Sequence, residues 1–191
     1  MSTARLEAFS DGVMAVLITI MVLELRSPQG ADFAALRAIG PQMGIYVLSF
    51  AIIGIYWNNH HHLFQAAERV SGGVMWANLH LLFWLSLLPF ATRWLWETAA
   101  APLPVAAYGA DLLLDAVAYY ILVRALLACQ PPESTLAKAI GGDFKGMLSV
   151  VVYAVAIPLT IVNHWIAIAL YAAVALIWLV PDRRIESRLG G

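Results

Sequence analysis

Three polar residues stand at the start of the first apolar segment of this 191-residue chain. Arg5, Ser10 and Asp11 precede a long apolar run that ends at Leu25. Ser10 or Asp11 can cap the free N–H groups at the start of a helix, where a carboxylate also meets the positive end of the helix dipole. Because the run behind Asp11 is apolar, Asp11 is expected at membrane depth, where ionisable side chains face protein or water. We therefore expect a structural polar network around Asp11 rather than direct ion binding.

A second polar patch, Asn58–His62, ends the second apolar segment. Consecutive residues point about 100° apart on a helix, so adjacent histidines do not share a face as the i, i+4 histidines of a metal site do. A metal site made from these residues alone is therefore not predicted. We expect one or two of them, among His60 and His61, to hydrogen bond with the polar residues of the first segment; the alternative is that they are solvated at the membrane interface.

A third polar feature is the acidic pair Asp111 and Asp115, which share one helix face at i, i+4 inside an apolar run. Acidic groups at membrane depth are typical of an ion path or a proton relay. The alternative, which we favour, places Asp111 near the outer interface, paired with Arg93 or Arg37. Asp115 is then hydrogen-bonded to a neighbouring helix, because polar groups inside membranes also join helices.

The apolar part of the first segment carries a regular stripe. Gly12, Val16, Ile20 and Leu23 fall on one face of a helix, with Thr19 at its edge. Spacing alone predicts that such a stripe is ordinary helix packing.

The composition of the chain indicates that these residues lie on membrane-spanning helices. Hydrophobic residues make up 62% of the chain and charged residues 12%, against about 25% charged in soluble domains, and the mean hydropathy is +0.78. At roughly 20 residues per crossing, the length accommodates about six membrane helices and no soluble domain. The net charge of −1 argues against nucleic acid binding. The single Cys129 provides no disulfide framework or metal-type cysteine pair, so no cofactor is expected.

The chain is therefore predicted to be an all-α integral membrane protein. Six crossings place both termini on one side, and the Lys and Arg residues gather there, leaving Arg26, Arg37 and Arg93 on the other; this predicts cytoplasmic termini. Asn163 and His164 mark a turn between the last two crossings. The expected spans are about 5–25, 42–64, 73–97, 104–129, 145–162 and 165–181, within one domain that covers residues 1–191.

The first segment also resembles a known family. The run Arg5–Gly12, with the triplet Phe9-Ser10-Asp11 and the apolar residues behind it, resembles the first helix of bacterial members of the transmembrane protein 175 family, the endosomal and lysosomal potassium channels. The resemblance extends through Trp57–Phe64 and Asn78–Thr92. It implies a homotetramer of six-helix units in which four copies of the first helix line a central pore. The chain has no ThrValGlyTyrGly-type segment, in keeping with channels of this family, which lack a P-loop filter.

The resemblance changes the interpretation of the stripe. It implies that Val16, Ile20 and Leu23 form constricting rings, and that Thr19 adds a ring of hydroxyls that replaces part of the water around an ion. Many relatives carry a longer Ile or Leu at the position of Val16, so the narrowest ring is either wider here or lies at Ile20 or Leu23. The resemblance further implies that a polar network holds the first helix in place; its expected members are Arg5, Phe9, Ser10, Asp11, His60 and His61.

Together these features predict a potassium-preferring cation channel in the inner membrane of a bacterium, gated by closure and dewetting of apolar rings. Its expected partners are three further copies of the chain, the lipid bilayer and potassium ions. The alternative function is a proton-coupled secondary transporter that uses Asp111, Asp115 and the histidine patch. A non-conducting membrane scaffold is a third reading. An enzyme is not predicted, because no nucleophile, base and orienting group occur together at a recognisable spacing.

Overall fold

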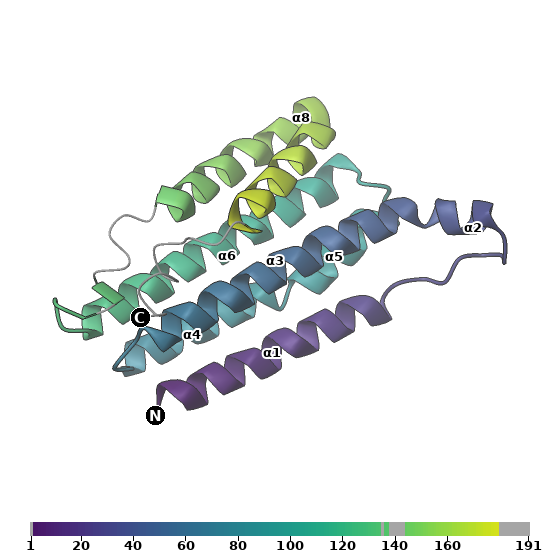
Figure 1. Cartoon of the computed structure of the whole chain (residues 1–191). Coiled ribbons are helices and arrows are strands. Elements are labelled where there is room, and N and C mark those ends of the chain that lie inside the picture. Colours follow the sequence, from purple (N-terminus) through teal and green to yellow (C-terminus); the bar gives the residue numbers. More distant parts are fainter. Residues whose placement is uncertain (1, 135, 138–143, 180–191) are drawn as a thin grey trace.

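The computed structural model describes residues 2–134, 136–137 and 144–179, and in these ranges every regular element is a helix. Long helices lie side by side in one bundle, and the short α2 lies beyond the end of α1 (Figure 1). The helices are α1 (Thr3–Leu23), α2 (Phe33–Ala38), α3 (Gly40–Gln65), α4 (Gly72–Leu85), α5 (Leu88–Glu97), α6 (Pro102–Cys129) and α8 (Phe144–Leu179).

Helix starts follow the local sequence. Ser2, Asp32 and Ser71 cap α1, α2 and α4 with their side-chain oxygens, which accept hydrogen bonds from N–H groups three residues later. The helices α3, α5 and α6 begin instead with a proline in the first turn. An N–H group at that position makes no hydrogen bond within the helix, so its absence in proline costs nothing. The expectation that Ser10 or Asp11 caps α1 is wrong, because the helix begins at Thr3 and contains both residues.

Among the described residues, five helical segments are long and apolar enough to cross a membrane, as a multi-pass membrane protein requires. They comprise 3–23, 40–65, 72–97, 102–129 and 145–179. The third consists of α4 and α5, which are separated only by Ser86 and Leu87.

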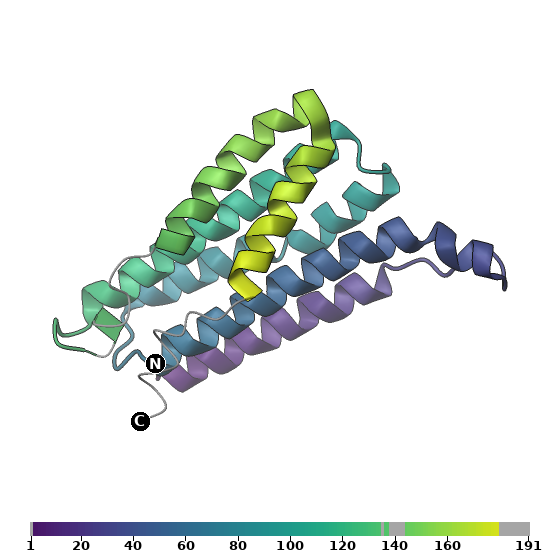
Figure 2. The same ribbon diagram turned by 45° about the horizontal axis from the view of Figure 1, so that its top comes forward.

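The helix α8 is divided at Asn163, where the backbone is extended (φ −158°, ψ 107°). Its two arms fold back on one another (Figures 1 and 2). The Asn163 Oδ1 accepts a hydrogen bond from the Trp165 N–H at 2.9 Å and so begins the second arm. The break expected at Asn163 is therefore present. The expected end of the last span, residues 180–181, lies outside the described residues.

The helix α6 lies at the centre of the bundle and packs against α4, α5 and α8. Tyr171 of α8 approaches Gly109 of α6 so closely that a side chain at Gly109 would overlap its hydroxyl, and that hydroxyl donates to the carbonyl of Val105 at 3.3 Å. The helix α1 packs against α3, α4 and α5 at the side of the bundle away from α8 (Figure 1). One face of α1 is therefore not covered by any of the residues that the structure describes.

The two ends of the bundle differ in the helices that begin and finish there. At the N-terminal end α1 begins and α3 and α6 finish (Figure 1). The first arm of α8 runs away from this end, and the second arm runs back toward it (Figures 1 and 2). At the opposite end α1 finishes, α5 finishes and α6 begins (Figure 1).

Candidate functional site

The two faces of α1 have different surroundings. One face is buried in the bundle and consists of Leu6, Ser10, Met14, Leu17 and Met21, at the spacing of a helical stripe. The other face is exposed although its side chains are large and apolar, which for a membrane-embedded helix indicates contact with lipid, with another chain or with a pathway.

The exposed face carries the residues that the family resemblance assigns to the pore. Val16 is 54% exposed, Ile20 39% and Leu23 82%. Phe9 lies on the same face toward the N-terminal end and is also exposed. The four side chains follow one another along α1, so a partner placed against this face would meet them as successive layers.

Thr19 lies at the edge of this face and is exposed. Its hydroxyl donates to the carbonyl of Val16, with 2.8 Å between Oγ1 and O. A hydroxyl oxygen has two acceptor lone pairs, so Thr19 can still accept a hydrogen bond or coordinate a cation. The exposed face of α1 thus offers one side-chain oxygen among apolar groups.

A buried chain of hydrogen bonds holds the other face of α1 to its neighbours. The Asn78 amide of α4 donates to Ser10 Oγ at 2.9 Å, and Ser10 donates to the carbonyl of Leu6 at 2.9 Å. The Asn78 Oδ1 lies 2.8 Å from His60 Nε2 of α3, which donates because an amide oxygen can only accept. All three side chains are fully buried, so the chain joins α1, α4 and α3 inside the bundle.

A second contact joins α1 to α3 nearer the N-terminal end. His61 Nδ1 lies 2.6 Å from Glu7 Oε1, and the His61 ring stacks on Trp57. Both side chains are partly buried, so this contact lies at the packed interface of α1 and α3.

The sequence-based network is only partly brought together. Ser10 reaches His60 through Asn78, and His61 reaches α1 through Glu7. In the described part of the chain, Asp11 Oδ1 is buried without a hydrogen-bond partner, the Arg5 side chain is exposed without an ion pair, and Phe9 lies on the exposed face. The positions of these residues are compatible with a structural role, but only three of the six, Ser10, His60 and His61, take part in the contacts that α1 makes.

The sequence analysis did not assign roles to Glu7 and Asn78. Both lie inside the motifs that carry the family resemblance, Arg5–Gly12 and Asn78–Thr92. The available signal was chemical: an amide within an apolar helix must find a partner, because an unpaired polar group is costly there.

The acidic pair lies elsewhere, in the core of the subunit. Asp115 is fully buried and Asp111 is 7% exposed. None of their four carboxylate oxygens has a hydrogen-bond partner among the described residues. The expected pairing of Asp111 with Arg93 or Arg37 is not present among the described residues, since Arg93 contacts Glu24 and Glu97 instead. The expected hydrogen bond from Asp115 to a neighbouring helix is not present there either.

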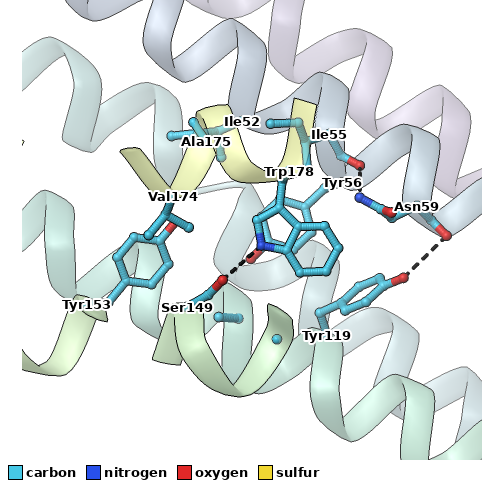
Figure 3. A pocket seen from close by; sticks show the side chains of 12 residues that line it. Ile52, Ile55, Tyr56, Asn59, Tyr119, Ser149, Tyr153, Val174, Ala175 and Trp178 are labelled. Atoms are coloured by element: carbon cyan, nitrogen blue, oxygen red, sulfur yellow. Dashed lines mark hydrogen bonds between the residues drawn. The ribbon is translucent and has the colours of Figure 1, made fainter. Parts of the chain in front are cut away.

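A small pocket of about 40 Å³ opens between α3, α6 and α8, on the side of the bundle away from α1 (Figure 3). Trp178 Nε1 donates to Ser149 Oγ at 2.8 Å across it, and the Tyr119 hydroxyl donates to the carbonyl of Asn59 at 3.3 Å (Figure 3). The first bond joins the two arms of α8 and the second joins α6 to α3. The pocket therefore belongs to the packing of α8 and not to the face of α1.

Comparison with known proteins identifies the family. Residues 5–89 match the family described as endosomal/lysosomal potassium channel TMEM175. A protein named potassium channel from Chryseobacterium sp. (strain P1-3) is 51% identical over 189 residues, which cover 99% of this chain and 98% of that protein. The chain belongs to the TMEM175 family. The resemblance drawn from the motifs is thereby confirmed, and TMEM175 is a family of channels rather than of enzymes.

Similarity to TMEM175 proteins extends to the fold. The crystal structure of a lysosomal potassium-selective channel TMEM175 homolog from Chamaesiphon minutus matches this TMEM175 chain with a TM-score of 0.79 and 26% identity, over 93% of this chain and 96% of that one. The endosomal/lysosomal proton channel TMEM175 of Rattus norvegicus is 34% identical over 103 residues, which cover 48% of this chain and 21% of that protein.

Proposed function

We propose that the chain is a potassium-preferring cation channel that assembles as a homotetramer around the exposed face of α1. The observation that carries the proposal is the contrast between the two faces of α1: one is packed and hydrogen-bonded, and the other exposes Val16, Ile20 and Leu23. The relatives named potassium channel and potassium-selective channel support the permeant ion. Each subunit crosses the inner membrane of a bacterium six times, with both termini cytoplasmic, when the arms of α8 are counted separately.

The proposed pathway has no P-loop filter and is constricted by apolar rings. A narrow apolar ring excludes water, and an ion cannot pass because stripping its water without replacement ligands is costly. Ile20 and Leu23 would form the rings toward the opposite end of the bundle, and Val16 the ring nearer the middle of α1. Thr19 would place four hydroxyl oxygens between the rings of Val16 and Ile20, where they replace part of the ion's water.

The buried network gives α1 a defined rotation. Ser10, Asn78 and His60 form a hydrogen-bonded chain only when Ser10 faces α4, and this rotation directs Ile20 and Thr19 away from the subunit. Turning α1 about its axis would leave these buried groups unpaired, at a cost of about 1–3 kcal/mol each. We propose that the network holds the pore-lining face toward the axis.

Two measurements on the purified protein test the proposal directly. In planar bilayers under opposed potassium and sodium gradients, we expect a current that reverses near the potassium equilibrium potential, without any proton gradient. Chemical cross-linking in lipid is expected to end at a four-subunit band. A silent bilayer or a dimeric limit would contradict the proposal.

The alternative, proton-coupled transport, is favoured by one observation: the carboxylates of Asp111 and Asp115 are buried without hydrogen bonds. Ionisable groups at such depth are typical of proton relays. Asp111→Asn and Asp115→Asn keep the size of each side chain and remove its proton chemistry. If the chain is a channel, potassium flux into liposomes is expected to persist in both variants and to need no proton gradient.

The matched control is Asp32→Asn, which changes an exposed aspartate and keeps an oxygen to cap α2. A stoichiometric exchange of protons for potassium that disappears in Asp115→Asn but survives in Asp32→Asn would favour the transporter instead.

A further inference from the structure

Four charged side chains join the end of α1 to α5 at the opposite end of the bundle. Arg93 Nε lies 3.5 Å from Glu24 Oε2 and 3.1 Å from Glu97 Oε1, and Arg26 Nη2 lies 2.7 Å from the same Glu97 oxygen. The Arg26 guanidinium also lies 5.0 Å from the centre of the Trp96 ring. The charges alternate in sign along the series Glu24, Arg93, Glu97, Arg26, which we call the outer charge cluster.

The cluster is adjacent to the pore-lining face of α1. Glu24 directly follows Leu23, and Ile20 lies one turn before it. A cavity of about 520 Å³ has Ile20 and Glu24 on one wall and Arg93 and Glu97 on another. The cluster is therefore the contact through which the last turn of α1 is attached to its own subunit beside that cavity.

The position of Glu24 requires a counter-charge. Glu24 is the C-terminal cap of α1, and a carboxylate there meets the negative end of the helix dipole, which is unfavourable. Its side chain is only 29% exposed, so water offsets this cost incompletely. Arg93 supplies the opposite charge from α5, and a helix end with an unfavourable charge is thereby held to a neighbouring helix.

We propose that Glu24 and Arg93 are positioning residues that hold the outer end of α1 away from the pore axis and so oppose collapse of the Ile20 and Leu23 rings. The inference rests on the proposed function. Apolar side chains around a wet pathway attract one another, because contact removes apolar surface from water. In a tetramer this attraction draws the four copies of α1 together, and the outer charge cluster of each subunit acts against it.

Arg93→Glu is the variant that tests the inference, because it replaces attraction to Glu24 with repulsion. We expect the open probability in planar bilayers to fall by about fivefold or more, since weak exposed pairs act together in four subunits. The current through each open channel is expected to change much less. Arg93→Gln, which adds no repulsion, is expected to have a smaller effect in the same direction and serves if Arg93→Glu fails to assemble.

The exchanged pair Glu24→Arg with Arg93→Glu is expected to restore the open probability. The exchange leaves the net charge of the outer charge cluster unchanged. Restoration of the open probability would therefore indicate a direct contact between residues 24 and 93 and not a general effect of charge on nearby ions. Arg37→Glu is the matched control: it makes the same charge change at the same end, on α2, where Arg37 has no ion pair with a described residue. Its open probability is expected to match that of the parent.

A measurement that needs no ion conduction tests the attachment itself. Hydrogen–deuterium exchange of residues 18–26 is expected to rise in Arg93→Glu and to return toward the parent in the exchanged pair. Unchanged exchange in Arg93→Glu, or an open probability that the exchanged pair fails to restore, overturns the inference. Ile20→Asn distinguishes failure of the positioning inference from failure of the proposed pore. If Ile20→Asn alters conductance while Arg93→Glu alters neither hydrogen–deuterium exchange nor open probability, the positioning inference fails and the pore assignment stands.

Discussion

Ile20→Asn is expected to raise the single-channel conductance by about tenfold and to weaken the preference for potassium over sodium. An amide supplies a hydrogen-bonding group worth about 1–3 kcal/mol where an apolar side chain offered none, and about 1.4 kcal/mol corresponds to a tenfold rate. Ile20 is exposed on the uncovered face of α1, so the amide is expected to enter the proposed pathway without disturbing the core of the subunit. Bilayer recordings with potassium and sodium gradients measure both quantities.

Val22→Asn is the control for this substitution. Val22 is also exposed on α1 but points away from the stripe, so the same amide there is expected to leave conductance unchanged. Leu23→Asn is expected to act as Ile20→Asn does. Unchanged currents in both Ile20→Asn and Leu23→Asn would show that this face of α1 does not line the pore.

Asn78→Ala is expected to destabilise the assembled protein more than any other single change in the polar network. The substitution leaves His60 Nε2 without its acceptor in the core, and a group orphaned in this way costs about 1–3 kcal/mol. It also removes one hydrogen bond of the Ser10 hydroxyl, worth about 1 kcal/mol, while Ser10 still donates to the Leu6 carbonyl. We expect the free energy of unfolding to fall by about 2–4 kcal/mol, whereas channels that still assemble keep their ion preference. Thermal denaturation followed by size-exclusion chromatography measures the loss.

Asn59→Ala is the matched control, because the Asn59 amide donates only to the Ile55 carbonyl of its own helix, at 2.8 Å. Its removal costs one local bond and separates no helices. A tetramer of Asn78→Ala as stable as that of Asn59→Ala would show that the network does not hold α1 in place.

Several elements could be predicted from local sequence because local interactions decide them. Long apolar runs make membrane helices almost regardless of context, since backbone groups in lipid must pair within their own segment. The break at Asn163 was also visible, and the family resemblance of α1 was correct. The cap of α1 was assigned wrongly, because Ser10 looks like a helix cap in the sequence while Ser2 fills that role.

Partners of charged groups were harder to predict. Asp111 was expected to pair with Arg93 or Arg37, whereas Arg93 contacts Glu97 on its own helix and Glu24, the residue that caps α1. The i, i+4 spacing of Arg93 and Glu97 was a local signal for the first contact. The contact with Glu24 has no such signal, because it depends on how α1 and α5 lie against each other.

The rotation of α1 about its axis is a feature that the tertiary structure determines and the sequence alone does not. The sequence by itself determined that 3–23 is a membrane helix of a TMEM175 protein and which residue types it carries. It did not determine which side packs, because the helix is apolar almost all round and its hydrophobic pattern favours no face. Tertiary structure decided this through Asn78 of α4, which pairs with Ser10 in one rotation only and is itself held by His60 of α3. That rotation buries Met14 and leaves Ile20 exposed, since separating Ser10 from Asn78 inside an apolar bundle would be costly.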